Sequence, residues 1–109
     1  MKLSQAILKG CKIAPSKCLG ELFGEPGEAC ALGAALLGAG YRPRAGTSEN
    51  TKTRRLKSTW PFLRSHKAFQ DASKGFWETD LLYEQILHLN DTAMWSRQHI
   101  AHWLAKHGL

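Results

Sequence analysis

The chain has 109 residues, and its 15 Lys or Arg residues exceed its 9 Asp or Glu residues by six. This length is enough for one domain with a modest core and too short for two. Valine is absent, and the β-branched aliphatic residues are only Ile7, Ile13, Ile86 and Ile100, whereas Leu, Ala and Lys are plentiful. Such a composition suits helices better than a central sheet. The sequence therefore predicts one mainly α domain over residues 1–109.

The compartment is predicted from the apolar runs and the cysteines. No uninterrupted apolar stretch of signal-peptide length follows Met1, and the uncharged run that begins at Ala29 is well short of the ~20 residues that a bilayer requires. Cys11, Cys18 and Cys30 are odd in number and lack the spacing of a disulfide framework. We expect a cytoplasmic protein with reduced thiols and no membrane partner.

Residues 28–39 predict a buried central helix around which the domain packs. Twelve uncharged, mostly small residues follow Glu28, whose charge suits a helix N-terminus, and Gly40 can adopt the left-handed conformation that ends a helix. Leu36 belongs to the bulky side of this helix. The opposite flank is small enough for another backbone to approach closely. Its residues are Cys30, Ala31, Ala34, Ala35 and Gly38.

Two segments precede this helix. Ser4 is suited to cap a first helix, which must end before Pro15. Residues 16–27 contain three glycines and predict irregular chain, with a type II turn at residues 25–27 because Pro26 and Gly27 fit its two central positions.

The middle of the chain, residues 41–75, predicts a basic and partly flexible segment. Residues 45–53 contain almost nothing to bury and predict a mobile surface loop. Pro61 is suited to open a short helix. Aromatic and imidazole rings follow Pro61 at helical spacing, at Phe62, His66 and Phe69. Residues 75–79 predict a further break.

Two helices are expected in the last third. Asp80 is a candidate cap for a helix with an apolar stripe over residues 82–89, and Asn90-Asp91 should end this helix and turn the chain. Ser96 should cap the final helix, which Gly108 stops.

Two motifs resemble those of a group of small bacterial and phage proteins. The first is Cys30-Ala-Leu-Gly-Ala-Ala35, and the second joins Ile86-Leu-His-Leu-Asn-Asp91 to Trp95-Ser-Arg-Gln-His-Ile-Ala-His-Trp-Leu104. The resemblance covers about residues 3–40 and 81–105. It implies recurring core and cap residues around a variable middle, and it implies no activity and no functional residue.

Catalytic and metal sites have weak signals. The glycines at 33, 38 and 40 lack the Gly-Lys-Ser/Thr of a phosphate loop, the cysteines lack a Cys-x-x-Cys pair, and His99 and His102 have no third ligand nearby in sequence. Cys18 is the one cysteine expected to be exposed, but nothing identifies a base beside it. We expect no metal, no cofactor and no enzymatic activity.

Charge gives the strongest functional signal. Between residues 42 and 67 there are eight basic residues against Glu49 alone, a local balance of +7, so the rest of the chain sums to 7 − 8 = −1. The candidate binding residues are Arg42, Arg44, Lys52, Arg54, Arg55, Lys57, Trp60, Arg64 and Lys67. The sequence predicts sequence-tolerant binding of nucleic acid or a nucleoprotein complex, in which Trp60 either stacks on bases or anchors the segment to the core.

The alternative function uses the same residues. A small accessory protein, encoded by a phage, could inhibit or adapt an acidic host or defence protein through this basic segment. Both hypotheses describe a binding protein, and they differ in whether the partner is a nucleic acid or an acidic protein surface.

Overall fold

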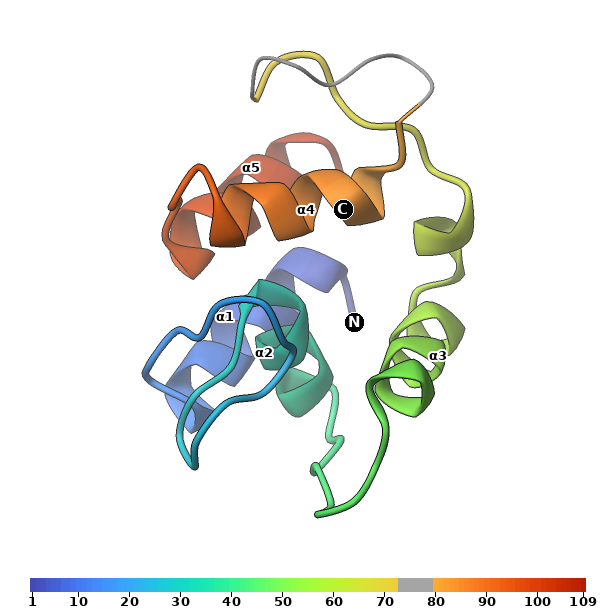
Figure 1. Ribbon diagram of the computed structural model, residues 1–109. Coiled ribbons are helices and arrows are strands. Elements are labelled where there is room, and N and C mark those ends of the chain that lie inside the picture. The colour runs from blue at the N-terminus through green and yellow to red at the C-terminus, as the bar shows by residue number, and fades with distance from the viewer. Residues whose placement is uncertain (73–79) are drawn as a thin grey trace.

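The computed structural model describes residues 1–72 and 80–109, and the predicted break at 75–79 lies outside them. The described residues form a small mainly α domain, as expected (Figure 1). Its elements are α1 (Leu3–Ile13), α2 (Ala31–Gly38), α3 (Glu49–Thr59), the 3-10 helix η1 (Pro61–Arg64), α4 (Leu82–Asp91) and α5 (Arg97–Lys106). None of these helices is long and apolar enough to cross a bilayer.

The central helix is confirmed, but it is shorter than predicted. All eight residues of α2 are buried, and Gly40 beyond its C-terminus has a φ of +99°. The helix begins at Ala31 because Cys30 is its N-cap, with Sγ 3.4 Å from the N–H of Gly33. Glu28 lies before the helix, where it makes an isolated β-bridge with Ser16.

The small flank of α2 is packed closely against α1. A Cβ on Gly10 would overlap the carbonyl oxygen of Ala34, and a Cβ on Gly38 would overlap that of Ala6. Each helix thus has a glycine where the other helix presents backbone. The predicted close approach of another backbone to this flank is confirmed, and α1 is the element that supplies it.

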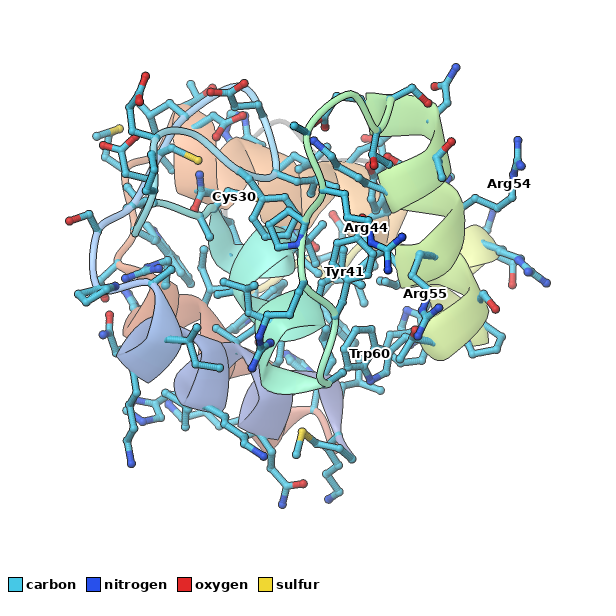
Figure 2. The ribbon with its side chains drawn as sticks, turned by 90° about the horizontal axis from the view of Figure 1, so that it is seen from below. Cys30, Tyr41, Arg44, Arg54, Arg55 and Trp60 are labelled. Atoms are coloured by element: carbon cyan, nitrogen blue, oxygen red, sulfur yellow. The ribbon has the colours of Figure 1, made fainter. Side chains whose placement is uncertain are left out.

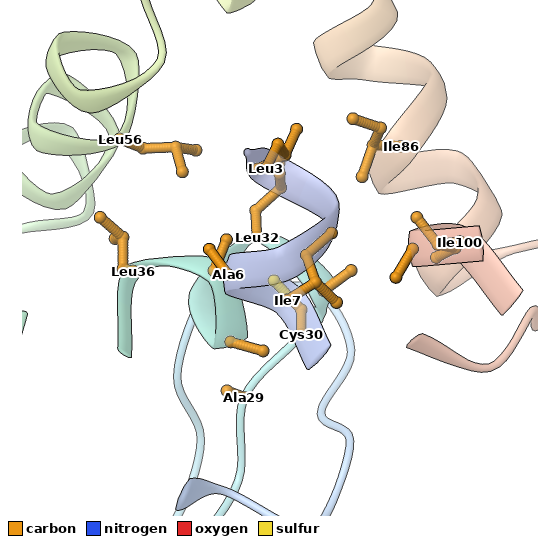
Figure 3. Close-up of a cluster of buried hydrophobic side chains, with 14 of the residues drawn as sticks. Leu3, Ala6, Ile7, Ala29, Cys30, Leu32, Leu36, Leu56, Ile86 and Ile100 are labelled. Atoms are coloured by element: carbon orange, nitrogen blue, oxygen red, sulfur yellow. The ribbon is translucent and has the colours of Figure 1, made fainter. Parts of the chain in front are cut away.

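The remaining helices complete the core around this pair. Leu3 and Ile7 of α1, Ile86 of α4 and Ile100 of α5 are fully buried in one cluster, which also receives Leu56 of α3 (Figure 3). The core therefore joins side chains from all five α-helices.

Two buried polar side chains connect distant parts of the chain. Asn90 accepts a hydrogen bond from the N–H of Ala31 at 3.0 Å and donates one to the carbonyl oxygen of Cys18 at 3.1 Å. Asn90 is thus the last buried residue of α4 and not the predicted turn residue; the left-handed residue after α4 is Met94, with φ +58°. The amide satisfies a donor at the first residue of α2 that would otherwise be unpaired.

Arg97 makes the second connection. Its side chain donates to the carbonyl oxygens of Ala14 at 2.7 Å, Pro15 at 2.8 Å and Ala29 at 3.2 Å. Ala14 and Pro15 follow the C-terminus of α1, where free carbonyls and the helix dipole favour a cation. Arg97 is only 4% exposed, and its guanidinium is satisfied by these backbone groups.

Two of the predicted helix starts are wrong by one or two residues. Ser4 is buried inside α1 and its N–H bonds to the carbonyl oxygen of Leu109, while Lys2 is the N-cap. Asp80 is not the cap of α4, because Leu81 holds that position. Ser96 is confirmed as the N-cap of α5, with Oγ 3.0 Å from the N–H of His99, and Gly108 has a φ of +79°.

The segment after η1 is also not the helix predicted through residues 62–69. Pro61 opens only the four-residue η1. The chain then docks on the C-terminal helices, where the side-chain amide of Gln85 pairs with both backbone groups of Phe69 at 2.9 and 2.6 Å. Asp71 accepts hydrogen bonds from the indole of Trp103 at 3.1 Å and pairs with His107 at 2.9 Å.

Candidate functional site

Helix α3 occupies the position of the predicted mobile loop, and the prediction of a loop over residues 45–53 is wrong from residue 49 onward. Ser48 caps the helix, with Oγ accepting from the N–H of Thr51 at 3.2 Å, and Glu49 places a negative charge in the first turn. Leu56 is the one fully buried residue of α3. The basic residues are therefore arranged on a folded scaffold.

The two faces of α3 differ sharply in chemistry. Leu56 faces the core. Glu49 is seven residues earlier, about two helical turns, so it lies in line with Leu56 and away from the outer arginines, although its side chain is half exposed. There its carboxylate lies 3.3 Å from Nζ of Lys52. The outer face is exposed and carries no acidic residue. It consists of Asn50, Thr51, Arg54, Arg55 and Ser58, which we call the outer face of α3.

Cation–π contacts attach α3 to the rest of the domain. The ring of Phe23 stacks on that of Tyr41 at 6.1 Å between centroids, and α3 places Lys52 over Phe23 at 5.6 Å and Arg55 over Tyr41 at 6.0 Å. Lys57 lies 4.5 Å from the ring of Tyr83. Such contacts stabilise by roughly 0.5–1 kcal/mol each at exposed sites. Three of the predicted binding residues thus also hold the helix in place.

The nine predicted binding residues do not all remain available. Trp60 is 5% exposed and donates its indole N–H to the carbonyl oxygen of Met1 at 3.1 Å, so its ring is not free to stack on a base. Arg42 donates to the carbonyl oxygens of Leu37 at 3.0 Å and Tyr41 at 2.8 Å, which closes the C-terminus of α2. For Trp60 this is the second of the two roles that the sequence left open, whereas the structural role of Arg42 was not predicted.

Five exposed cations remain around α3. They are Arg44 before the helix, Arg54 and Arg55 on its outer face, and Arg64 and Lys67 after it. Within residues 1–72 and 80–109, none of the five makes an ion pair with a carboxylate. Figure 2 shows Arg44, Tyr41 and Arg55 between the 41–46 segment and α3, with Arg54 directed away from the body. The charges of Arg44, Arg54, Arg64 and Lys67 are therefore available to a partner, whereas Arg55 is exposed but also lies over the ring of Tyr41.

The surface here is only shallowly concave. A hollow of about 310 Å³ is lined by Tyr41, Thr51, Arg54, Arg55 and Ser58. A second hollow of about 430 Å³ lies at the C-terminus of α2, between Lys9, Arg42 and Trp60. An open surface with arginines suits an extended anionic partner better than an enclosed small molecule.

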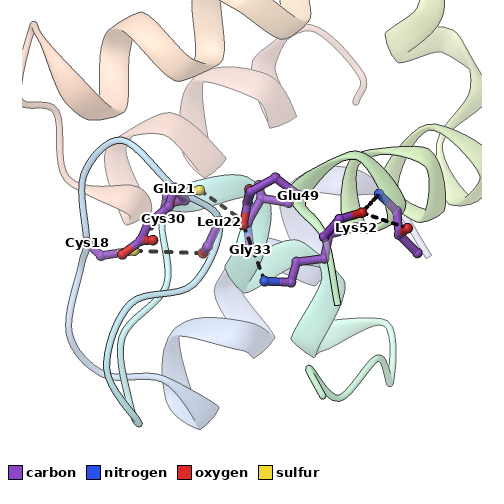
Figure 4. A network of polar contacts seen from close by, with 9 residues as sticks. Cys18, Glu21, Leu22, Cys30, Gly33, Glu49 and Lys52 are labelled. Atoms are coloured by element: carbon purple, nitrogen blue, oxygen red, sulfur yellow. Dashed lines mark hydrogen bonds and ion pairs between the residues drawn. The ribbon is translucent and has the colours of Figure 1, made fainter. Parts of the chain in front are cut away.

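The cysteines differ from the expectation that Cys18 is exposed. All three are buried, and the Sγ atom of Cys18 lies 3.4 Å from the carbonyl oxygen of Glu21 (Figure 4). Burial raises the pKa of the Cys11 and Cys18 thiols and raises that of Cys30 to about 12. The thiols are therefore protonated at neutral pH and poor nucleophiles.

Metal-binding and acid–base groups are similarly dispersed. In the part of the chain that the structure describes, no three His, Cys, Asp or Glu side chains are close enough to hold a metal ion. His99 stacks on the ring of Trp95 at 3.8 Å, and His107 stacks on Phe69 at 3.6 Å. These rings are used in packing the C-terminal helix.

Comparisons of the chain with models of protein families, with curated protein sequences and with solved structures found no significant match.

Proposed function

We propose that this protein binds nucleic acid, without catalysing a reaction on it, through the outer face of α3 and the exposed cations that flank it. The observation that carries the proposal is the segregation of charge on α3. Glu49, the single acidic residue between residues 42 and 67, pairs with Lys52 at the start of α3, while Arg54 and Arg55 are exposed on the outer face, which has no carboxylate. A phosphate backbone is the partner that such a surface attracts most generally.

The accompanying polar groups support this partner. Asn50, Thr51 and Ser58 supply amide and hydroxyl groups beside the arginines, and these groups also bind phosphate oxygens in protein–nucleic acid contacts. The buried, protonated cysteines support a binding role over a catalytic one.

The test is the salt dependence of binding to a mixed-sequence nucleic acid, measured by fluorescence anisotropy. Affinity should fall steeply between about 50 and 200 mM salt, because counterions are released from each neutralised phosphate. Replacing Arg44, Arg54 and Arg55 together by Ala should reduce the slope of log K against log salt by about two to three. Loss of the contact between Arg55 and Tyr41 should cost only roughly 0.5–1 kcal/mol, so circular dichroism should still show the helical content of the folded domain.

A matched control removes the same charge elsewhere. Lys2 at the N-cap of α1, Lys12 in α1 and Lys106 in α5 are exposed, and their joint replacement by Ala should leave most of the slope intact. An equal decrease of the salt slope in both variants would show that net charge alone drives binding. Absence of binding by the unmodified protein at low salt would refute the proposal.

A second candidate function is inhibition or adaptation of an acidic host or defence protein through the same surface. The pairing of Tyr41 with Arg55 favours it, since Tyr and Arg are enriched among energetically dominant residues of protein interfaces. A pull-down from host lysate with and without nuclease separates the two functions. A partner protein retained after nuclease treatment, and lost from the Arg44, Arg54 and Arg55 variant, would favour this second function.

A further inference from the structure

We propose that the nucleic acid is double-stranded DNA of B form, and that α3 lies in its major groove with Asn50 and Arg54 toward the base edges. This inference rests on the proposed function, to which it adds the form of the ligand and the element that contacts it.

The placement of α3 in the fold favours this mode of binding. The helix has 11 residues and is therefore about 16 Å long, and Leu56 is its single fully buried residue. Among the described helices, η1 is its main neighbour, and α3 stands at the edge of the domain (Figure 1). The major groove of B-DNA is about 12 Å wide and 8.5 Å deep, which admits one helix presented in this way.

The outer face of α3 has side chains suited to base edges. Asn50, Arg54 and Ser58 are spaced by four residues and form one row along the helix. Arg makes paired hydrogen bonds to guanine O6 and N7, and Asn makes them to adenine N6 and N7. Within the described residues, no hydrogen bond occupies the side chain of Asn50 or Arg54, so both retain their full capacity for base edges.

Positive charge lies along the chain on both sides of the helix. Arg44 precedes α3, and Arg64 and Lys67 follow it, and all three are exposed. A helix in the major groove lies between two phosphate backbones, so cations beyond both of its ends are suited to contact them. Glu49, which would be repelled by a backbone, is neutralised by Lys52.

The alternative nucleic acids fit this surface less well. Proteins that bind single strands stack successive bases on exposed aromatic rings. Here Trp60 is buried, and Phe23 and Tyr41 are half-buried with Lys52 and Arg55 over their rings. Double-stranded RNA has a deep, narrow major groove that a helix does not enter. Duplex DNA is therefore the ligand that the outer face of α3 favours.

The first experiment compares duplex DNA, duplex RNA and single-stranded DNA of one sequence at one salt concentration. Duplex DNA should bind at least tenfold more tightly than duplex RNA, although both present phosphates at similar density. The second experiment is dimethyl sulfate footprinting of the DNA complex. It should show protection of guanine N7, which lies in the major groove, and not of adenine N3, which lies in the minor groove.

Two conservative variants assign the contact to a residue. Arg54→Lys keeps the charge but loses the paired geometry, so it should retain the salt slope, weaken N7 protection and reduce affinity for a duplex selected from a random library by roughly five- to hundredfold. Arg64→Lys, the matched control beyond the end of α3, should change N7 protection little. Similar losses of guanine N7 protection in the Arg54→Lys and Arg64→Lys variants would overturn the role of Arg54.

The outcomes distinguish failure of the duplex-DNA inference from failure of the proposed nucleic-acid binding. Equal affinity for duplex DNA and duplex RNA, tighter binding of a single strand, or protection confined to adenine N3 would overturn this inference while the proposed nucleic-acid binding stands. Absence of binding to all three probes would overturn both.

Discussion

The contact between α1 and α2 makes a prediction that sets two effects of opposite sign against each other. Gly10→Ala replaces a poor helix former by the best one in the middle of α1, which by propensity alone would stabilise the helix by about 1 kcal/mol. The added Cβ, however, would overlap the carbonyl oxygen of Ala34 in α2. The two effects must be compared in magnitude.

The steric effect should win at this position. Extra methylenes in packed cores typically cost about 1–3 kcal/mol. Here the obstacle is the backbone of a fully buried helix, which cannot rotate away as a side chain could, so we expect a cost near the upper end. Subtracting the propensity gain leaves a loss of about 2 kcal/mol. This corresponds to a decrease in Tm of about 8–16 °C for a domain of this size.

The assay is urea denaturation followed by circular dichroism, together with thermal melting. Lys9→Ala is the matched control, because Lys9 neighbours Gly10 in α1 but is exposed, and its free energy of unfolding should change by less than about 0.5 kcal/mol. Gly38→Ala should resemble Gly10→Ala, and the double variant should lose less than the sum because both act on one interface. A Gly10→Ala protein as stable as the original would refute the close packing of α1 on α2.

Three further predictions concern the core, the thiols and an ion pair. Leu36→Asp buries an unpaired charge and should unfold the protein, since that costs several kcal/mol of the roughly 5–15 available, and a normal Tm would refute the core assignment. Chelator and reductant should leave Tm unchanged, because the helices supply a continuous apolar core. A large decrease of Tm with chelator would indicate a metal site, and one with reductant would indicate a disulfide. Hydrogen bonds from Trp103 and His107 lower the pKa of Asp71 in the folded state. The ionised carboxylate therefore stabilises the folded protein fully above pH ~4, and this contribution is lost as pH falls through the folded-state pKa. Asp71→Asn should therefore flatten the acid side of the Tm profile, and an unchanged profile would contradict this contact.

Local signals were sufficient where a helix has both an apolar stripe and a cap. Ser96 and Gly108 bound α5, Pro15 follows the end of α1, and Gly40 stops α2, each through a conformational preference of the residue itself. The turn at Pro26-Gly27 is confirmed for the same reason, with φ +85° at Gly27 and a hydrogen bond of 2.9 Å from the N–H of Glu28 to the carbonyl oxygen of Glu25.

Helix α3 was missed because it has almost no apolar periodicity. Only Leu56 is fully buried, and the helix docks through Lys52 and Arg55, which sequence patterns count as surface residues. A usable signal did exist: Ser48 followed by Glu49 is a typical helix start, and Leu56 and Trp60 are one turn apart. Taken together, these features predict a polar helix that packs on the core along one side.

The role of Asn90 could not have been predicted from its neighbours in sequence. Its partners Ala31 and Cys18 are 59 and 72 residues away, so the environment that buries its amide exists only in the folded chain. Trp60 shows the same limit. Its ring could stack on a ligand or fill the core, and only the position of the Met1 carbonyl oxygen decides for the core.

The position of Arg97 has a consequence for how the protein is made. The three carbonyl groups that it satisfies belong to Ala14, Pro15 and Ala29, which a ribosome synthesises long before residue 97. Until α5 emerges, these acceptors lack the guanidinium, and the side of α1 that packs on α5 stays uncovered. Co-translational folding should therefore stop at a loose α1–α2 pair, and the native domain should form only once the C-terminal helix has left the ribosome.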